Sequence, residues 1–178
     1  MVRTLILLVL VALGSGPALA EMPAAVDPSD IPNYRVIRPG LAFGGQPSPE
    51  TLKRLGDMGF RTIVNIRTEQ EGAPAEEGVV RAQGLEFVWV PVTSGTFSLE
   101  DVEAIEKVLD DPAAAPVLLH CASGNRVAAV WGVIRARDGR TQEQVEADAR
   151  GAGLHSPSMW EAVLRVLGWG AEPVPATP

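Results

Sequence analysis

The stretch Pro116-Val-Leu-Leu-His-Cys-Ala-Ser-Gly-Asn-Arg126 decides the fold, because it reads as a buried strand that leads through a short turn into a helix. Residues 117–119 are apolar without alternation, as expected of a parallel strand that is covered on both faces. Residues 126–137 are apolar on nearly every side, which predicts a central, largely buried helix. Cys121, the only cysteine of the chain, stands at the end of this strand.

The turn between this strand and this helix predicts an anion cradle around Cys121. Such a short turn aims backbone N–H groups and the positive end of the helix dipole at an anion above the sulfur, and the same field favours a thiolate. Arg126 adds a permanent charge and a planar fork for two oxygens of an oxyanion. A plainer alternative is that the lone cysteine is only a small buried hydrophobe. The residues whose backbone would line the cradle are Ala122, Ser123, Gly124 and Asn125.

Two residues outside the turn are candidates for the same site, because ligands of open α/β sheets bind outside the carboxyl ends of the strands. Arg67 ends a predicted strand at the same edge as Cys121, so it could line the cleft or could instead pair on the surface with Glu69 or Glu71. Gln46 follows a Gly-Gly pair that permits close backbone approach, so its amide could reach the anion or only stabilise the turn.

Two polar side chains of the loop itself have open roles. His120 precedes Cys121 on a strand, so its ring should point to the opposite face and brace the loop by hydrogen bonding rather than act as a base. Ser123 could donate its hydroxyl to the thiolate or could only close the turn.

The strand, the His120-Cys-x-Ser-Gly-x-Arg126 loop and the following helix resemble the phosphatase-like domain that is also found fused to metallo-β-lactamase-type sulfur hydrolases. The resemblance extends from about Tyr34 to Trp160, and it includes Gly44-Gly-Gln-Pro-Ser48 and Ile63-Val-Asn-Ile-Arg67. More distantly, the chain is similar to dual-specificity tyrosine phosphatases and to rhodaneses. This resemblance implies a tyrosine-phosphatase-like α/β fold of three layers, a mainly parallel sheet flanked by helices, with Cys121 as nucleophile and Arg126 as anion clamp.

Two departures from the phosphatase pattern shape the expected chemistry. Such phosphatases place five residues between cysteine and arginine, whereas this chain has four, as rhodanese-like sulfurtransferases do. Such phosphatases also carry an aspartate on the loop after the preceding strand, whereas residues 92–98 contain no carboxylate. Glu100 and Asp101 are close by, but we expect Ser98 to cap a helix with Asp101 in its first turn. Because a positioned acid contributes about 10²–10⁴ in rate, its absence weighs against phosphate monoesters.

Three functional classes follow from these features. The first expectation is an enzyme that transfers sulfane sulfur through a persulfide on Cys121, because a thiolate that attacks sulfane sulfur needs no general acid. The alternative is a phosphoester hydrolase that works through a cysteinyl-phosphate. The third class is a non-catalytic sensor of anions or thiol redox state. The expected partner is accordingly a small anionic, sulfane-sulfur or phosphorylated substrate.

Composition and the chain ends bear on the possible partners, the metal sites and the cellular location of the protein. The formal net charge of −7 argues against nucleic acid as a partner, and one cysteine with two histidines argues against a structural zinc site; no cofactor is expected. Residues 1–20 have the layout of a signal peptide, which predicts export to the periplasm or the medium without a stable membrane anchor after cleavage. The remaining chain is divided into a flexible leader (21–33), a cysteine-dependent domain (34–169) and a disordered tail (170–178).

Cap signals place further helices within this domain. Ser48-Pro49-Glu50 should begin a helix that carries Leu52, Leu55 and Met58 on one face and ends at Gly59. Thr141-x-x-Gln144 and Ser158-x-x-Glu161 read as capping boxes that begin two more helices.

Overall fold

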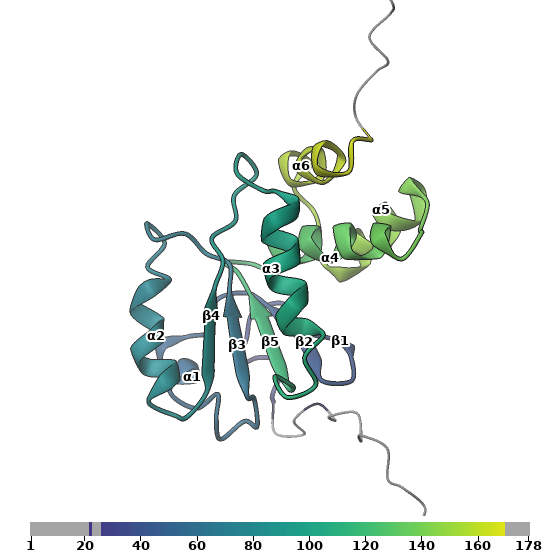
Figure 1. Cartoon of the computed structure of the whole chain (residues 1–178). Helices are drawn as coiled ribbons and strands as arrows, with labels where there is room; N and C mark the ends of the chain where they lie inside the picture. The colour runs from purple at the N-terminus through teal and green to yellow at the C-terminus, as the bar shows by residue number, and fades with distance from the viewer. Residues whose placement is uncertain (1–21, 23–25, 170–178) are drawn as a thin grey trace, which may run out of the picture.

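The computed structural model describes Met22 and residues 26–169, so the predicted signal peptide and tail lie outside the described residues. A five-stranded sheet forms its centre, in the order β1-β2-β5-β3-β4 (Figure 1). Only the β1–β2 pairing at the edge is antiparallel; the other three are parallel. The strands are β1 (Arg35–Arg38), β2 (Leu41–Gly44), β3 (Thr62–Asn65), β4 (Glu86–Trp89) and β5 (Val117–His120).

Six helices flank this sheet. Two of them, α1 and α2, cover one face, while α3 and α4 cover the other, and α5 and α6 pack on α4 (Figure 1). The helices are α1 (Pro49–Leu52), α2 (Pro74–Arg81), α3 (Leu99–Leu109), α4 (Asn125–Arg137), α5 (Gln142–Ala152) and α6 (Pro157–Leu167).

The central strand β5 explains why the fold has two separate cores. It pairs in parallel with β2 on one side and with β3 on the other, and all four of its residues are buried. Because side chains alternate across a strand, Leu119 joins the core beneath α3 and α4, whereas Leu118 joins the core beneath α1 and α2. The predicted three-layer fold with a mainly parallel sheet is confirmed.

The predicted helix starts at Ser98 and Thr141 are confirmed by reciprocal capping boxes. Ser98 accepts a hydrogen bond from the backbone of Asp101, whose carboxylate accepts one from the Ser98 amide; Thr141 and Gln144 repeat the pattern. A third capping box, expected from Ser158 and Glu161, is wrong. The helix α6 is capped two residues earlier by Ser156, because a proline with its fixed φ occupies the first helical position.

The first helix is shorter than expected, since the sequence suggested that it continues to Gly59. A side chain from elsewhere interrupts it: the Gln83 amide accepts from the Gly56 N–H at 2.9 Å and donates to the Leu52 carbonyl at 2.7 Å. These two backbone groups would otherwise bond to each other in a continuing helix. Leu55 nevertheless remains fully buried in the turns that replace it.

The segment before β1 is packed, which differs from the expected flexible leader. Ile31 is fully buried against the α1 and α2 face, and the Pro32 carbonyl accepts a hydrogen bond from the Gly45 amide at 2.6 Å. The ordered domain therefore begins several residues before Tyr34. Within Met22 and residues 26–169, no helix combines the length and the apolar character that a membrane crossing would need.

Candidate active site

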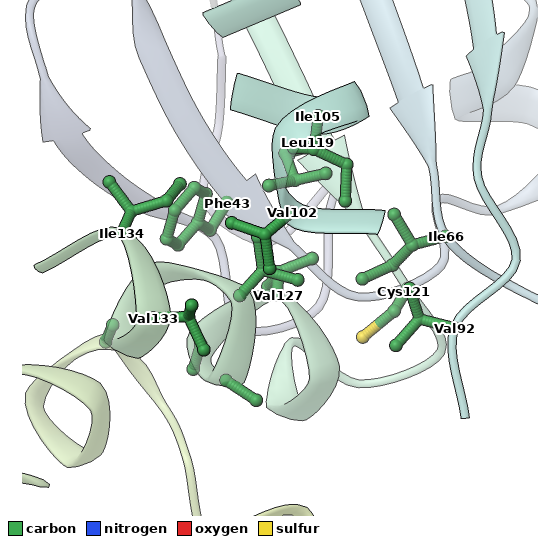
Figure 2. Close-up of a cluster of buried hydrophobic side chains, with 14 of the residues drawn as sticks. Phe43, Ile66, Val92, Val102, Ile105, Leu119, Cys121, Val127, Val133 and Ile134 are labelled. Atoms are coloured by element: carbon green, nitrogen blue, oxygen red, sulfur yellow. The ribbon is translucent and has the colours of Figure 1, made fainter. Parts of the chain in front are cut away.

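The thiol of Cys121 lies directly after β5, at the carboxyl edge of the sheet and on the face that α3 and α4 cover. Only 1% of the residue is exposed, and its side chain lies beside Ile66 and Val92 (Figure 2). One polar group reaches the sulfur, because the Gly124 amide donates to Sγ at 3.1 Å. Apolar neighbours fit the reading of a buried hydrophobe, whereas the amide at the sulfur fits the anion cradle; the structure contains both features.

The loop owes its shape to one glycine and several tethers. Gly124 has φ 84° and precedes the first residue of α4, a left-handed conformation that glycine adopts without strain. The backbone N–H of Gln46 donates to the Ala122 carbonyl at 3.1 Å, and the Asn33 side chain donates to the Ser123 carbonyl at 3.0 Å. These tethers hold two loop carbonyls from outside, while the Gly124 amide is left to bond the sulfur.

Arg126 is held by a carboxylate that the sequence did not assign to the site. Its Nη1 and Nη2 lie 2.7 and 2.5 Å from the two Glu71 oxygens, and Nη1 also donates to the Val92 carbonyl at 3.1 Å. The hydrogen bond with Arg126 lowers the pKa of Glu71 to about 2. Burial alone would lower the pKa of Arg126, but its hydrogen bond with Glu71 and its proximity to Cys121 raise it. Arg126 is therefore fixed as a cation beside the sulfur.

Glu71 is fixed in turn by the segment that follows β3. The Thr68 amide donates to the Glu71 carboxylate at 2.9 Å, and the Thr68 hydroxyl does so at 3.1 Å. The Glu71 backbone carbonyl accepts from Arg67. This turn thus links both arginines of the predicted site through a single residue.

Arg67 is partly buried, and its pairing partner is Glu76, which differs from the predicted surface pair with Glu69 or Glu71. Its Nη1 also donates to the Gln46 side-chain oxygen at 2.5 Å. Gln46 therefore joins Arg67 to the Ala122 carbonyl, so both predicted residues support the turn next to the loop. Neither contacts Cys121.

His120 points to the opposite face from Cys121, as its position on the strand predicts. It is fully buried, and its Nε2 lies 3.5 Å from the Glu76 carboxylate, which also accepts from Asn65 at 3.0 Å. Burial lowers the pKa of His120 to about 3, and the charge of Arg67 adds to this effect. Burial raises the pKa of Glu76 despite Arg67. A neutral imidazole thus packs against a buried ion pair beneath the loop.

Two predicted loop residues do not have side chains on the anion side. The Asn125 side-chain oxygen accepts from the amides of His155 at 2.9 Å and Ser156 at 3.0 Å, so it anchors the turn between α5 and α6. The Ser123 hydroxyl makes no hydrogen bond to Cys121; the Gly124 amide takes that role. The contribution of Ser123 is its carbonyl, which the Asn33 side chain holds.

The described residues provide no positioned general acid. Residues 92–98 contain no carboxylate, and Asp101 is engaged with the Ser98 amide at 3.0 Å in the capping box. Glu71 is near the site, but with a pKa of about 2 it is ionised at neutral pH. Within Met22 and residues 26–169, no group of three or more His, Cys, Asp or Glu side chains could hold a metal ion.

Glu71 and Glu76 are the residues that sequence reasoning missed. Each is one of several acidic residues in the stretch 69–77, and nothing in their local spacing marks them. Their partners are far away in sequence: Arg126 is 55 residues after Glu71. A weak signal existed, since the carboxyl ends of β3 and β5 lie side by side and a buried arginine requires an acidic partner.

Comparisons with known proteins agree with this geometry. Residues 33–138 match the family model described as "Beta-lactamase hydrolase-like protein, phosphatase-like domain". A Xylella fastidiosa protein named "Beta-lactamase hydrolase-like protein" is 30% identical over 132 residues, which are 70% of this chain but 30% of that protein. The chain thus spans less than a third of the length of this relative.

Solved structures of two further proteins show the same fold. The core catalytic domain of the PP-IP phosphatase SIW14 from S. cerevisiae, in complex with citrate, superposes with a TM-score of 0.59 at 16% identity, over 75% of this chain and 85% of that one. P. aeruginosa TpbA superposes with a TM-score of 0.60 at 19% identity, over 88% and 92%. Because the family model covers more than half of the chain, including the whole Cys121 loop, this protein belongs to the phosphatase-like domain family of the beta-lactamase hydrolase-like proteins.

Proposed function

We propose that this protein is a cysteine-dependent phosphoester hydrolase. The observation that carries the proposal is the Cys121 sulfur, which accepts from the Gly124 amide at 3.1 Å at the start of a helix whose Arg126 is held beside it. Membership in a phosphatase-like family supports phosphoryl transfer over the sulfur transfer that the four-residue spacing first suggested.

The proposed reaction has two steps. The Cys121 thiolate attacks phosphorus and forms an S–P bond, while the P–O bond to the leaving group breaks and its electron pair stays on oxygen. Water then attacks the cysteinyl-phosphate, the S–P bond breaks, and the thiolate and inorganic phosphate are released. Loop amides and Arg126 bind the oxygens that carry the charge in both steps.

Arg126 can bind a substrate oxyanion in addition to Glu71, because Glu71 contacts only the two terminal nitrogens of the guanidinium. Glu71 takes Nη1 and Nη2, whereas a substrate oxyanion could use the edge formed by Nε and Nη2. Glu71 therefore orients the clamp without filling it. A cavity of about 450 Å³ lies between the turn after β3 and the loop after β4; Thr68, whose hydroxyl bonds Glu71, lines it, whereas Cys121 and Arg126 do not.

The absence of a positioned acid sets the leaving-group preference. An unprotonated leaving group departs readily only when it is weakly basic, so aryl phosphates and phosphoanhydrides should react and alkyl phosphates should react poorly. The test is turnover of aryl phosphates with graded leaving-group pKa. We expect a steep dependence on that pKa and complete loss in Cys121→Ser; turnover that survives in Cys121→Ser would overturn the proposal.

Sulfur transfer is the second candidate, and two observations favour it: the four-residue spacing between Cys121 and Arg126 and the missing acid. Mass spectrometry after incubation with thiosulfate separates the two. One added sulfur on Cys121, together with no aryl phosphate turnover, would replace the phosphatase proposal. An unmodified Cys121 with phosphate turnover would support it.

A further inference from the structure

A polar cavity of about 270 Å³ lies against the loop, on the side where Ser123 and Gly124 turn their carbonyls outward. Its wall contains basic groups and no carboxylate, although the whole chain carries a net charge of −7. The residues that line it include Asn33, Arg35, Ser123, Gly124, Arg150 and His155.

Arg35 is the strongest cation of this cavity. Among the described residues, its side chain makes one hydrogen bond, a long one of 3.4 Å from Nη1 to the Gly151 carbonyl, and has no acidic partner. Gly153 lies next to the guanidinium: a Cβ there would be in ordinary contact with it, 3.7 Å from Arg35 Nε. The remaining guanidinium N–H groups of Arg35 are thus available to a ligand.

Arg150 and His155 complete the basic wall. Arg150 pairs with Glu146, one turn earlier on α5, through Nε and Nη2, and Glu146 does not line the cavity. His155 Nδ1 donates to the Gly153 carbonyl at 3.0 Å, so the Nε2 lone pair of the neutral ring is left to accept a hydrogen bond from a P–OH group.

The carbonyl groups of the wall do not oppose an anion, because they already have donors. The Ser123 carbonyl accepts from Asn33, and the Gly124 carbonyl accepts from the Ala128 amide at 3.1 Å. Asn33 holds its place with φ 55°, a left-handed conformation that asparagine tolerates better than most residues. These backbone carbonyls are thus satisfied, and the wall presents the guanidinium groups of Arg35 and Arg150 and the imidazole of His155.

We propose that this cavity is a second anion site that binds a phosphoryl group through Arg35, Arg150 and His155. A guanidinium fork matches phosphoryl oxygens, which favours this chemistry. The phosphoryl group could belong to a free small molecule or to a substrate that carries one besides the group attacked at Cys121. Only the second source rests on the proposed phosphoester hydrolysis.

The test is an NMR titration of the full chain with inorganic phosphate in low-salt buffer. The ring signals of His155, exposed where His120 is buried, report on the cavity. We expect a saturable shift whose Kd rises about tenfold or more in Arg35→Gln. Arg165→Gln is the matched control, because Arg165 is also exposed and bonds only the Ser94 carbonyl, away from the cavity; it should bind phosphate as wild type does.

A shift that never saturates, or an isotherm that is the same in Arg35→Gln, would overturn the site. If the site binds phosphate, kinetics show whether the phosphoryl group belongs to a substrate or to a free ligand. If the substrate supplies the group, Arg35→Gln lowers the ratio of kcat/KM for an aryl phosphate with a second phosphoryl group to kcat/KM for one without. An unchanged ratio with retained phosphate binding assigns the site to a free ligand. The titration uses no turnover, so failure of the proposed hydrolysis leaves its result readable.

Discussion

Glu71 meets Arg126 end-on, with both carboxylate oxygens on the two terminal nitrogens of the guanidinium at 2.7 and 2.5 Å. The pair joins the turn after β3 to the first turn of α4, so two segments that are distant in sequence set the direction of one cation. The edge of the guanidinium that Glu71 leaves unused is the one that a bound oxyanion needs.

Replacing Glu71 by glutamine should weaken the clamp. The amide keeps the size of the side chain but loses the charge, so Arg126 is less firmly oriented, and kcat/KM for an aryl phosphate should fall by about 10-fold to 100-fold. Steady-state kinetics measure this, with Glu143→Gln, an exposed glutamate in the first turn of α5, as the control. An increase in activity would mean instead that Glu71 competes with substrate for Arg126.

Gly124→Ala tests whether the geometry of the Cys121 loop affects activity beyond its effect on stability. A left-handed φ costs a non-glycine residue about 1–2 kcal/mol, and the strain would displace the amide that donates to Cys121. Gly139→Ala is the matched control, because Gly139 has φ 80° with open space around it, away from the site. Urea unfolding should show similar destabilisation in both variants, while only Gly124→Ala loses aryl phosphate turnover. Equal activities would show that the Gly124 amide is dispensable.

Arg67→Met should expose the importance of the buried pair. It leaves the Glu76 carboxyl, which is 5% exposed, without its cation, and breaking such a pair typically costs about 3–5 kcal/mol. Arg81→Met, which breaks a solvent-exposed pair with Glu77, should destabilise the protein much less. Denaturant unfolding compares the two. The double variant Arg67→Met with Glu76→Leu should recover part of the loss; no recovery would contradict a pairing role.

Acid should destabilise the fold through His120. The pKa of His120 is about 3 in the folded chain and near 6.5 when unfolded, so between these values the unfolded chain binds a proton that the folded chain does not. Stability therefore falls as pH drops below 6.5, by up to about 1.4 kcal/mol per pH unit. The raised pKa of Glu76 acts in the opposite sense, so the comparison must be with a variant that keeps Glu76.

The variant His120→Asn provides that comparison. Urea unfolding at pH 7, 6 and 5 should give a steeper loss of stability for wild type than for His120→Asn. This pH range lies above the usual titration range of Glu71, which loses its stabilising charge only as pH falls from about 4.5 toward 2. Parallel pH profiles would show that His120 is not buried in its neutral form.

Sequence patterns predicted the elements whose signals are local. The apolar run before Cys121, the glycine turn and the capping residue Ser98 each act within a few positions, and the structure has them as predicted. Patterns failed where a distant side chain intervened. Gln83 interrupts the first helix through Gly56, and no feature near Gly56 indicates this.

The site shows the same division. The order of strand, loop and helix around Cys121 could be predicted. The face to which His120 points could be predicted too, because side chains alternate along a strand. The partners of Arg67 and Arg126 could not, because several carboxylates in the stretch 69–77 are equivalent in sequence and only the packing of α2 against the sheet selects Glu71 and Glu76. The side-chain partners of Asn125 could not be predicted either, because they are amides about 30 residues further along.

The register of the strands limits which insertions and deletions this fold can tolerate. Gly44, Asn65 and His120 stand opposite one another in adjacent strands, so the three strands end on one line across the sheet. Deleting one residue within β5 would exchange the faces of His120 and Cys121, and would move the sulfur from the side of α3 and α4 to the side of α1 and α2. Insertions and deletions that keep Cys121 in place are therefore expected only in the connections between strands, because the register of the short strands fixes its position.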